Sequence, residues 1–524
     1  MVKMRGWPGD GMFPTPGLPH EHPPHPCTRR GSVSLRQRVL GALSDAWGAR
    51  AVRFGFLGSF CILIGTLSPA YLPQVSPVWT VLNQLRWDGA VFKVVGTIFT
   101  MVGLGLLLET WLRLRPARRR ALGRPQLRYW AILAIIASPL LIAPPVFSHD
   151  AYSYAAQGWM LHNGISPYDV GPSVLPGYFA DQVAWVWRDT PAPYGPLALQ
   201  MSHGIVVLAG YAPFTSAMLM RIPALLGVLL IGWCTPRIAR RMGVDSAAAS
   251  WFVMCNPILI IDFVGGMHND ALMTGLMLLA IWLTLHLRQW WLGALIVGVA
   301  ATIKQPALLA AVVLPLVVIP VARWGDLRQV LRAGARVAAS VGLAIGVFAG
   351  ISVATGLGFG WINAVDVPGM VDTVSPFLVV GYVIQWGVDA LGLDSTGRMA
   401  INVSRAVGVV VFAVGAVWLA VRHLGKRPLH FLSWTYLLFA FCAPALHSWY
   451  VLWGGVLFPL TKPSTWWLRA AVIVTAVLLS YSAMNFALRN GFWLLAVLLM
   501  FVAFESVRGH TLSQQWEPLA GKRA

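Results

Sequence analysis

The chain has 524 residues, of which 57% are hydrophobic and 11% charged, and its formal net charge is +20. This composition excludes an ordinary soluble globular protein and indicates a polytopic membrane protein. The Lys and Arg residues gather between apolar runs, so the charge is attributed to membrane topology and not to nucleic-acid binding. The five cysteines lack metal-ligand spacing, so neither a disulfide framework nor a zinc site is predicted.

Residues 1–50 are rich in Pro, Gly and Arg and lack an apolar core, which predicts a disordered cytoplasmic tail. Apolar runs then recur through residues 51–506, which we assign to a single membrane domain, followed by a cytoplasmic tail at 507–524. Because a crossing helix needs about 17 to 20 apolar residues, we predict an all-α bundle of about 13–15 transmembrane helices, some of them short, tilted or paired as half-spans.

Positive charge sets the expected orientation. Residues 113–128 hold seven arginines and no acid, so this segment is predicted to be cytoplasmic. The long polar segment 148–196 then lies outside the cell as the first large loop, with short interfacial helices. Both termini are predicted to be cytoplasmic if the apolar run 197–213 is re-entrant.

The loop 148–196 combines four aspartates with many Tyr and Trp residues. Aromatic rings offer flat apolar faces to the C–H groups of a sugar, and carboxylates accept hydrogen bonds from its hydroxyl groups. The mixture therefore favours a polyol ligand, whereas the alternative is that the aromatic residues only anchor the loop at the membrane interface. Candidate substrate-binding residues of the loop are Tyr152, Tyr154, Trp159, Tyr168, Arg188 and Tyr194. For Arg188, an ion pair with Asp181 or Asp189 is the alternative to binding a phosphate.

Asp150 follows an apolar run that ends at Phe147, so its carboxylate is expected at the mouth of a membrane helix. There it could stay ionised yet poorly solvated, which suits a general base. The alternative is a helix cap, because the following residues look helical and Asp is a favoured N-cap.

A second polar cluster is the sequence GGMHND at 265–270. Asn256 and Pro257 are expected to break the preceding helix, and the paired glycines to allow a tight turn. Three side chains could then bind substrate hydroxyls, a phosphate or each other: His268, Asn269 and Asp270. The alternative is that Asn269 or Asp270 caps the next helix.

Lys304 lies in the middle of an apolar stretch. A lysine there costs about 2.5–3.5 kcal/mol on insertion scales, so it should face a cavity or an anion. If the turn predicted at Pro306 reaches the outer face, Lys304 approaches Asp150 and His268 and could hold a lipid phosphate. The alternative is a salt bridge to Asp262 or Asp270.

His447, Trp449 and Tyr450 are placed at an outer helix end, where they could cover a sugar or anchor the interface. The chain lacks a Walker loop and a nucleophile elbow, so ATP-driven transport and soluble-type hydrolysis lose support. It also lacks a DxD nucleotide-sugar motif, and this absence favours a lipid-linked donor. A lipid or sugar transporter is the alternative from another functional class, because an intramembrane lysine and a broken helix also suit a transport path.

Several motifs, in order over most of residues 50–505, are similar to those of one enzyme family: VFSHDAYSYAAQGWMLHNGISPYDVGP, APYGP, NPILIIDFVGGMHNDALMTGLM, IKQP and HSWY. The chain resembles the polyprenyl-phosphomannose-dependent α-1,6-mannosyltransferases of mycobacteria and corynebacteria, in the C-type glycosyltransferase superfamily. The resemblance implies a plasma-membrane enzyme that transfers mannose from a polyprenyl-phosphate-mannose donor to a lipid-anchored mannan, the backbone of lipomannan and lipoarabinomannan. It implies an extracytoplasmic active site.

The resemblance also implies roles for residues. The acidic residue at the start of the outer loop maps onto Asp150, which would act as the base of a single inverting displacement. Where the family often has Arg, this chain has His149, which leaves a phosphate role at that position in doubt. Lys304, Arg188 and His268 are the candidates to stabilise the departing phosphate. No dedicated metal-ligand set is found, and a divalent cation at Asp150 with Asp270 is left open, as is another polyprenyl-phosphate sugar donor.

Overall fold

A computed structural model describes residues 34–67, 72–73, 76–87, 89–116, 125–321, 325–393, 398–490, 505 and 508–509. These residues form helices and no strands, so the all-α prediction is confirmed. The predicted tails up to residue 33 and beyond residue 509, and most of the last apolar run, lie outside the described residues.

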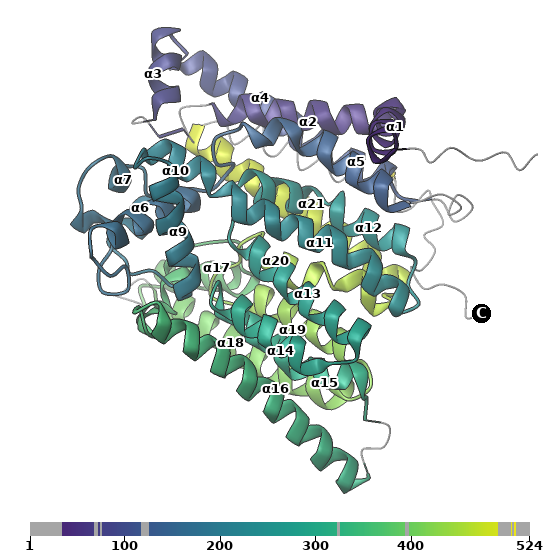
Figure 1. The fold of residues 1–524 in the computed structure, drawn as a ribbon. Coiled ribbons are helices and arrows are strands. Elements are labelled where there is room, and N and C mark those ends of the chain that lie inside the picture. Colours follow the sequence, from purple (N-terminus) through teal and green to yellow (C-terminus); the bar gives the residue numbers. More distant parts are fainter. Residues whose placement is uncertain are drawn as a thin grey trace, which may run out of the picture.

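The first helices pack on one side of the bundle (Figure 1). They are α1 (Leu35–Gly48), α2 (Arg50–Thr66), α3 (Pro77–Gln84), α4 (Ala90–Arg113), α5 (Pro125–Ala137) and the 3-10 turn η1 (Ser138–Leu141). Helices α2 and α4 approach closely where Gly58 and Gly103 meet, since a Cβ on Gly58 would lie 2.9 Å from the carbonyl oxygen of Gly103. Small residues commonly allow such close packing between membrane helices.

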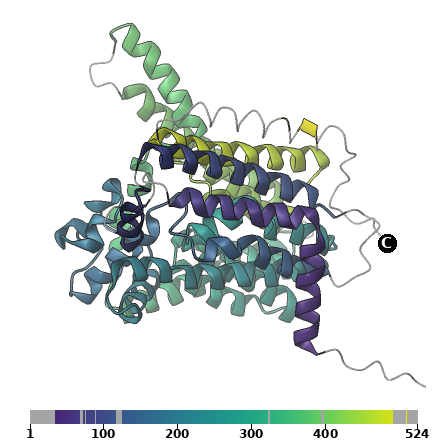
Figure 2. The same cartoon turned by 90° about the horizontal axis from the view of Figure 1, so that it is seen from above.

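Helix α1 corrects the prediction that the disordered tail extends to residue 50. Ser34 and Gln37 form a capping box at its first turn, and Ala46 is buried in the core. The helix meets α2 at 87° (Figure 2), so its contacts with the bundle stabilise a segment whose own composition does not demand a helix.

The segment between η1 and the central helices forms a cluster at one end of the bundle (Figure 1), which we call the loop end. Its elements are α6 (Asp150–His162), η2 (Pro172–Val174), α7 (Tyr178–Asp181), α8 (Trp185–Arg188), α9 (Pro196–Leu208) and α10 (Pro213–Leu219). The short helices predicted for the outer loop are thus present. Helix α9 packs on α6, and with 13 residues it is shorter than a full crossing needs.

The next group of elements contains the most deeply buried ones, although its last helix is exposed over most of its length. It consists of α11 (Arg221–Arg241), α12 (Ser246–Met254), the π-helical turn η3 (Leu259–Gly265), α13 (Asp270–Leu287), α14 (Trp290–Ala301), η4 (Gln305–Leu308), α15 (Leu309–Val318) and α16 (Leu327–Ala354). The predicted break at Asn256 and Pro257 is confirmed, because α12 and η3 are bent by 59°.

The remaining helices complete the bundle. They are η5 (Gly360–Ala364), η6 (Val367–Met370), α17 (Pro376–Ala390), α18 (Met399–Leu419), η7 (Ala420–Leu424), α19 (Pro428–Cys442), α20 (Tyr450–Gly455), η8 (Phe458–Thr461) and α21 (Thr465–Asn490). The turn from η7 to α19 carries Arg422, Lys426 and Arg427, and we call the end of the bundle where it lies the basic end.

Six helices are long and apolar enough to cross a membrane, or eight if each of two bent pairs is one span. Seven further apolar helices have 10–17 residues. The chain is therefore a multi-pass membrane protein. The expected 13–15 spans are not reached by single helices within the described residues, since many apolar runs fold as helices shorter than the roughly 20 residues that a full crossing needs.

Candidate functional site

The turn between α14 and η4 reaches the loop end and docks against the start of α9. The backbone N–H of Gly195 donates to the carbonyl oxygen of Ile303 (3.1 Å), and that of Leu197 donates to Thr302 (3.1 Å). A Cβ on Gly195 would overlap the carbonyl group of Thr302, so only glycine permits this approach. The predicted turn near Pro306 is thus present, and it delivers Lys304 to the loop end.

Lys304 and Asp270 form a buried ion pair. The Nζ atom of Lys304 donates to both carboxylate oxygens of Asp270, at 2.8 and 2.9 Å. The indole Nε1 of Trp453 donates to the same carboxylate at 2.7 Å. Asp270 is fully buried, so it does not merely cap α13, and of the two salt bridges considered for Lys304 the one to Asp270 is formed.

Asp150 begins α6 and faces a stack of rings. Its Oδ2 atom lies 3.3 Å from Nδ1 of the buried His268. His268 stacks on Trp449 with ring centroids 3.6 Å apart, and Trp449 stacks on His447 at 4.6 Å. Asp150 is the first residue of α6 and not its N-cap, and its side chain is 12% exposed, so its carboxylate is held beside the imidazole at the edge of a cavity.

The GGMHND turn differs from its predicted geometry. The left-handed conformation falls on Met267 (φ 61°) and not on the paired glycines. Gly266 is needed for space instead, because a Cβ there would lie 2.8 Å from the carbonyl oxygen of Asp262 and 3.0 Å from the His268 ring. Both amide atoms of Asn269 are buried without a hydrogen-bond partner in the described structure, so the side chain does not cap α13.

These elements enclose a cavity of about 690 Å³. Six residues predicted from the sequence line it: Asp150, Tyr194, Lys304, His447, Trp449 and Tyr450. His268 and Asp270 lie behind its wall, in contact with Asp150 and Lys304 respectively. The structure thus brings residues more than 290 positions apart in the chain around one cavity, as between Asp150 and Tyr450.

Other predicted residues lie away from the cavity. Tyr152 and Tyr154 pack in a buried cluster with hydroxyl groups that have no partner in the described structure. Trp159 stacks on Phe179 with ring centroids 5.1 Å apart, and Tyr168 donates a hydrogen bond to the backbone of the site residue Tyr194.

Two further predicted residues are also absent from the cavity wall. His149 packs edge-on against Tyr152, with ring centroids 5.5 Å apart. Arg188 donates to the backbone oxygen of Asp181 (3.3 Å) and forms neither of the ion pairs considered for it within the described residues. The loop aromatics therefore build the scaffold of the loop end more than the cavity surface.

Several residues that line the cavity were not predicted from the sequence. Arg405 and Asp366 add charge, and the others are Ser153, Gln157, Trp187, Gln305, Trp361 and Trp453. Arg405 did carry a signal, because it is an ionisable residue inside an apolar run, the same observation that singled out Lys304.

The surroundings of Asp150 keep it charged. Burial by itself would raise the pKa of this carboxyl, but the contact with His268 and the positive charge of Lys304 lower the pKa below its ordinary value. Burial lowers the pKa of His447 to about 4, so this imidazole is neutral near pH 7. A neutral imidazole and an ionised carboxylate therefore face the cavity together.

The residues of the described ranges contain no group of three His, Cys, Asp or Glu side chains placed to hold a metal ion. The lysine charge already neutralises Asp270, so the placement does not favour the divalent cation considered between Asp150 and Asp270.

Comparison with known proteins shows the family of the chain. Residues 52–323 match the family model described as alpha-(1->6)-mannopyranosyltransferase, N-terminal domain, and residues 379–508 match the MptB C-terminal domain. A probable alpha-(1->6)-mannopyranosyltransferase of Mycolicibacterium smegmatis is 34% identical over 76% of this chain and 77% of its own length. Alpha-(1->6)-mannopyranosyltransferase A of Mycobacterium tuberculosis is 32% identical over 76% of this chain and 78% of its own, and the enzyme of that name from Corynebacterium glutamicum is 31% identical over 64% and 71%. The chain belongs to the alpha-(1->6)-mannopyranosyltransferase family and is a membrane mannosyltransferase.

Proposed function

We propose that the cavity transfers mannose from a polyprenyl-phosphate-mannose donor to the 6-hydroxyl group of an α-1,6-mannan, with inversion and with Asp150 as the general base. The observation that carries the proposal is the position of Asp150, an ionised carboxylate on the wall of an aromatic-lined cavity. Trp187 and Trp361 supply flat faces for sugar rings.

The reaction needs one proton acceptor and one site for developing negative charge. The acceptor oxygen forms a bond to the anomeric carbon while the bond from that carbon to the phosphate oxygen breaks. The hydroxyl proton passes to the carboxylate of Asp150, and the electron pair of the broken bond leaves with the polyprenyl phosphate. His268 holds the carboxylate through Oδ2, which fixes its orientation without removing it from the cavity.

Arg405 is our preferred ligand for the donor phosphate. Its Nε atom is buried without a partner in the described structure, and its guanidinium reaches Asp372 through Nη2 at 2.9 Å. Lys304 lines the same cavity, but its ammonium group is ion-paired with Asp270. It therefore contributes a hydrogen-bond donor more than an unpaired positive charge. Arg188 lies outside the cavity wall.

The orientation of the site follows from the basic end. Arg422, Lys426 and Arg427 lie at the end of the bundle opposite the cavity, because α18 separates Arg405 from Arg422 by about 25 Å at 1.5 Å per residue. The positive-inside rule then assigns the basic end to the cytoplasm and the cavity to the extracytoplasmic face.

The test is mannose transfer from synthetic polyprenyl-phosphomannose to a short α-1,6-mannoside in membranes that hold equal amounts of each variant. We expect Asp150→Asn to lower turnover by about 10²–10⁴-fold, the range of a lost general base. Asp169→Asn, at an exposed position of the same segment, is the matched control and should retain activity.

Two outcomes would contradict the proposal. Equal transfer by the wild type and Asp150→Asn would show that Asp150 is not the base, and Asp366 would become the candidate. Absence of transfer by the wild type with a competent acceptor, together with transfer from a polyprenyl-phosphoarabinose donor, would assign a different sugar.

A further inference from the structure

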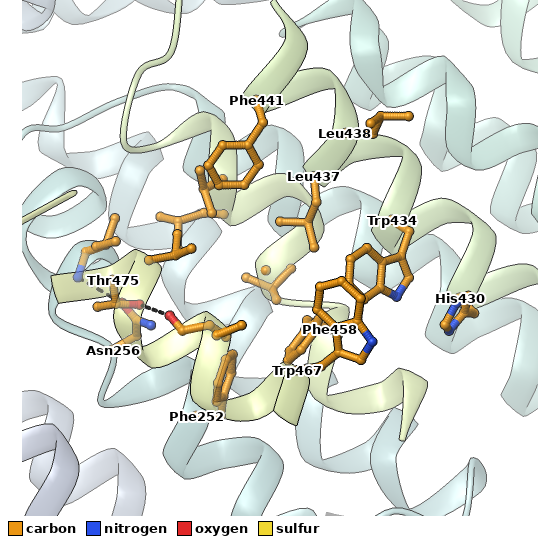
Figure 3. Close-up of a pocket in the computed structure, with 18 of the residues that line it drawn as sticks. Phe252, Asn256, His430, Trp434, Leu437, Leu438, Phe441, Phe458, Trp467 and Thr475 are labelled. Carbon is orange, nitrogen blue, oxygen red and sulfur yellow. Dashed lines mark hydrogen bonds between the residues drawn. The ribbon is translucent and has the colours of Figure 1, made fainter. Parts of the chain in front are cut away.

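A second cavity of about 610 Å³ lies on the other side of α19 and α20 from the proposed active site (Figure 3). The two cavities share no lining residue among those described: Phe439 and Trp453 face the first, whereas Leu438 and Leu452 face the second. The volume falls within the range of about 300–1,000 Å³ that is usual for ligand pockets.

The wall of this cavity is apolar over most of its length. Phe252, Leu437, Phe441 and Phe458 line it from three separate elements (Figure 3). Trp418 and Trp467 also line it, and they are 60% and 42% exposed, so the cavity opens sideways between α18 and α21 toward the lipid that would surround the bundle. Tryptophan is enriched where membrane helices meet the interface.

One end of the cavity is polar and lies at the basic end of the bundle. His423 and His430 line it there, with ring centroids 4.4 Å apart. The Nδ1 atom of His430 and the indole Nε1 of Trp434 are buried without a hydrogen-bond partner in the described structure. Two donor or acceptor groups are therefore left at the polar end of an otherwise apolar cavity.

Most of the charged side chains around this end are basic. Arg422, Lys426 and Arg427 are exposed on the same turn, and none of the ion pairs found within the described residues involves them. The sequence has no aspartate or glutamate between Asp394 and Glu505, which covers α18 to α21. Two acids near this end, Asp245 and Asp326, are engaged as the N-caps of α12 and α16.

We propose that this cavity binds one anionic phospholipid, with an acyl chain in the apolar part and the phosphate against His423, His430 and Arg427. The lateral opening admits a chain from the bilayer, and the unopposed positive charge selects an anionic headgroup. The proposed phosphate position is separate from the donor site, because His423 and His430 lie at the opposite end of α18 and α19 from Arg405 and Phe439.

Gly455 offers a direct way to fill the cavity. It lines the wall at the end of α20, and a Cβ built on it meets nothing within 4 Å. Gly455→Phe therefore places a ring in the lipid position without a backbone clash. Gly346→Phe is the matched control, because Gly346 lies exposed on α16, also has open space around its Cβ and does not line the cavity.

The experiment incubates delipidated full-length protein with phosphatidylglycerol or phosphatidylcholine that carry the same acyl chains, and measures the retained lipid by native mass spectrometry. We expect one phosphatidylglycerol to be bound about tenfold more tightly than phosphatidylcholine, a preference of about 1.4 kcal/mol. Gly455→Phe should lower its occupancy about tenfold, and Gly346→Phe should not. Arg427→Gln should reduce the preference for phosphatidylglycerol over phosphatidylcholine.

Three results would overturn the inference. The first is unchanged phosphatidylglycerol occupancy in Gly455→Phe whose thermal unfolding matches the wild type. The second is equal binding of the two phospholipids by the wild type. The third is displacement of phosphatidylglycerol by an equal concentration of polyprenyl phosphate, with a raised donor KM in Gly455→Phe, which would assign the cavity to the chain of the donor.

Discussion

The ion pair between Lys304 and Asp270 shows how single residues build the cavity wall. Both side chains are buried, and the pair is completed by the indole of Trp453. Desolvating two charges is costly, so each partner depends on the other to remain charged. The pair therefore fixes the α14–η4 turn against the start of α13, beside the carboxylate of Asp150.

This dependence predicts non-additive effects on stability. Lys304→Met or Asp270→Leu alone should lower the free energy of unfolding by about 3–5 kcal/mol, because each leaves a buried charge without its partner. The double variant should recover most of that loss, since no unpaired charge remains. Thermal unfolding of the three variants in one detergent measures the coupling, and additive losses would show that the pair does not act as a unit.

One sequence signal led to residues in or behind the cavity wall, namely a charged group beside an apolar run. Lys304, Asp150 and Asp270 are charged groups beside apolar runs, and such groups must find a partner or a cavity. Tyr168 and Trp159 carry no such signal, because an aromatic residue in a loop is equally suited to packing and to lining a cavity. Only the fold decides between these two roles. Arg405 was missed although it sits in an apolar run like Lys304.

At the scale of elements, the contact between the start of α9 and the tip of the α14–η4 turn assembles the cavity. Gln305 donates its side-chain amide to the carbonyl oxygen of Pro193 (3.2 Å), and Tyr436 donates to that of Pro306 (2.8 Å). Three elements distant in sequence thus meet at this turn. Tyr194 and Lys304 face the same cavity because the backbone hydrogen bond between the neighbouring residues Gly195 and Ile303 holds the two segments together.

Two glycine variants test this contact. Gly195→Ala should destabilise the protein by about 1–3 kcal/mol and lower mannose transfer, because the methyl group would overlap the backbone of Thr302 and push the turn away. Gly204→Ala in the same helix α9 has open space around its Cβ and should be neutral or stabilising by up to about 1 kcal/mol.

Thermal unfolding and transfer rates of both variants provide the measurements. A Gly195→Ala protein that matches Gly204→Ala in thermal unfolding and in transfer rate would show that the loop end does not need the close approach of Gly195 to Thr302.

Local sequence signals predicted some elements and not others. The break at Asn256 and Pro257 follows from proline chemistry, and α6 follows from the helical pattern after Asp150. The left-handed residue of the GGMHND turn is Met267, which could not be predicted because glycine is the residue that ordinarily adopts this conformation. Helix α1 depends on tertiary contacts that its own composition does not reveal.

At the scale of the whole molecule, polarity is separated along the bundle. The proposed mannosyl-transfer cavity lies at the loop end, and the proposed phospholipid cavity opens near the basic end, with the paired helices α19 and α20 between them. The distribution of Lys and Arg predicts a cytoplasmic basic end. The lengths of the apolar runs predict short or half-span helices, and seven apolar helices of 10–17 residues are found within the described residues.

Cysteine accessibility tests which end faces outward. Val174 at the loop end and Leu327 at the start of α16 are 46% and 68% exposed, so a cysteine at either position can react with a polar maleimide. The native Cys61, Cys234, Cys255 and Cys442 are buried, and a Cys27→Ser background removes the remaining native thiol. Arg328, Arg332 and Arg336 follow Leu327 on α16, so we expect that position to be cytoplasmic.

In intact cells, an impermeant maleimide should therefore label Val174→Cys and leave Leu327→Cys unlabelled until the membrane is permeabilised. The same cells, after permeabilisation, provide the control for reactivity at both positions. The reverse pattern would place the Asp150 cavity on the cytoplasmic side and would contradict the orientation inferred from the positive-inside rule. A donor presented on the outer face could then not reach the cavity. Labelling at both positions without permeabilisation would instead mean that the membrane normal does not separate the two ends of the bundle.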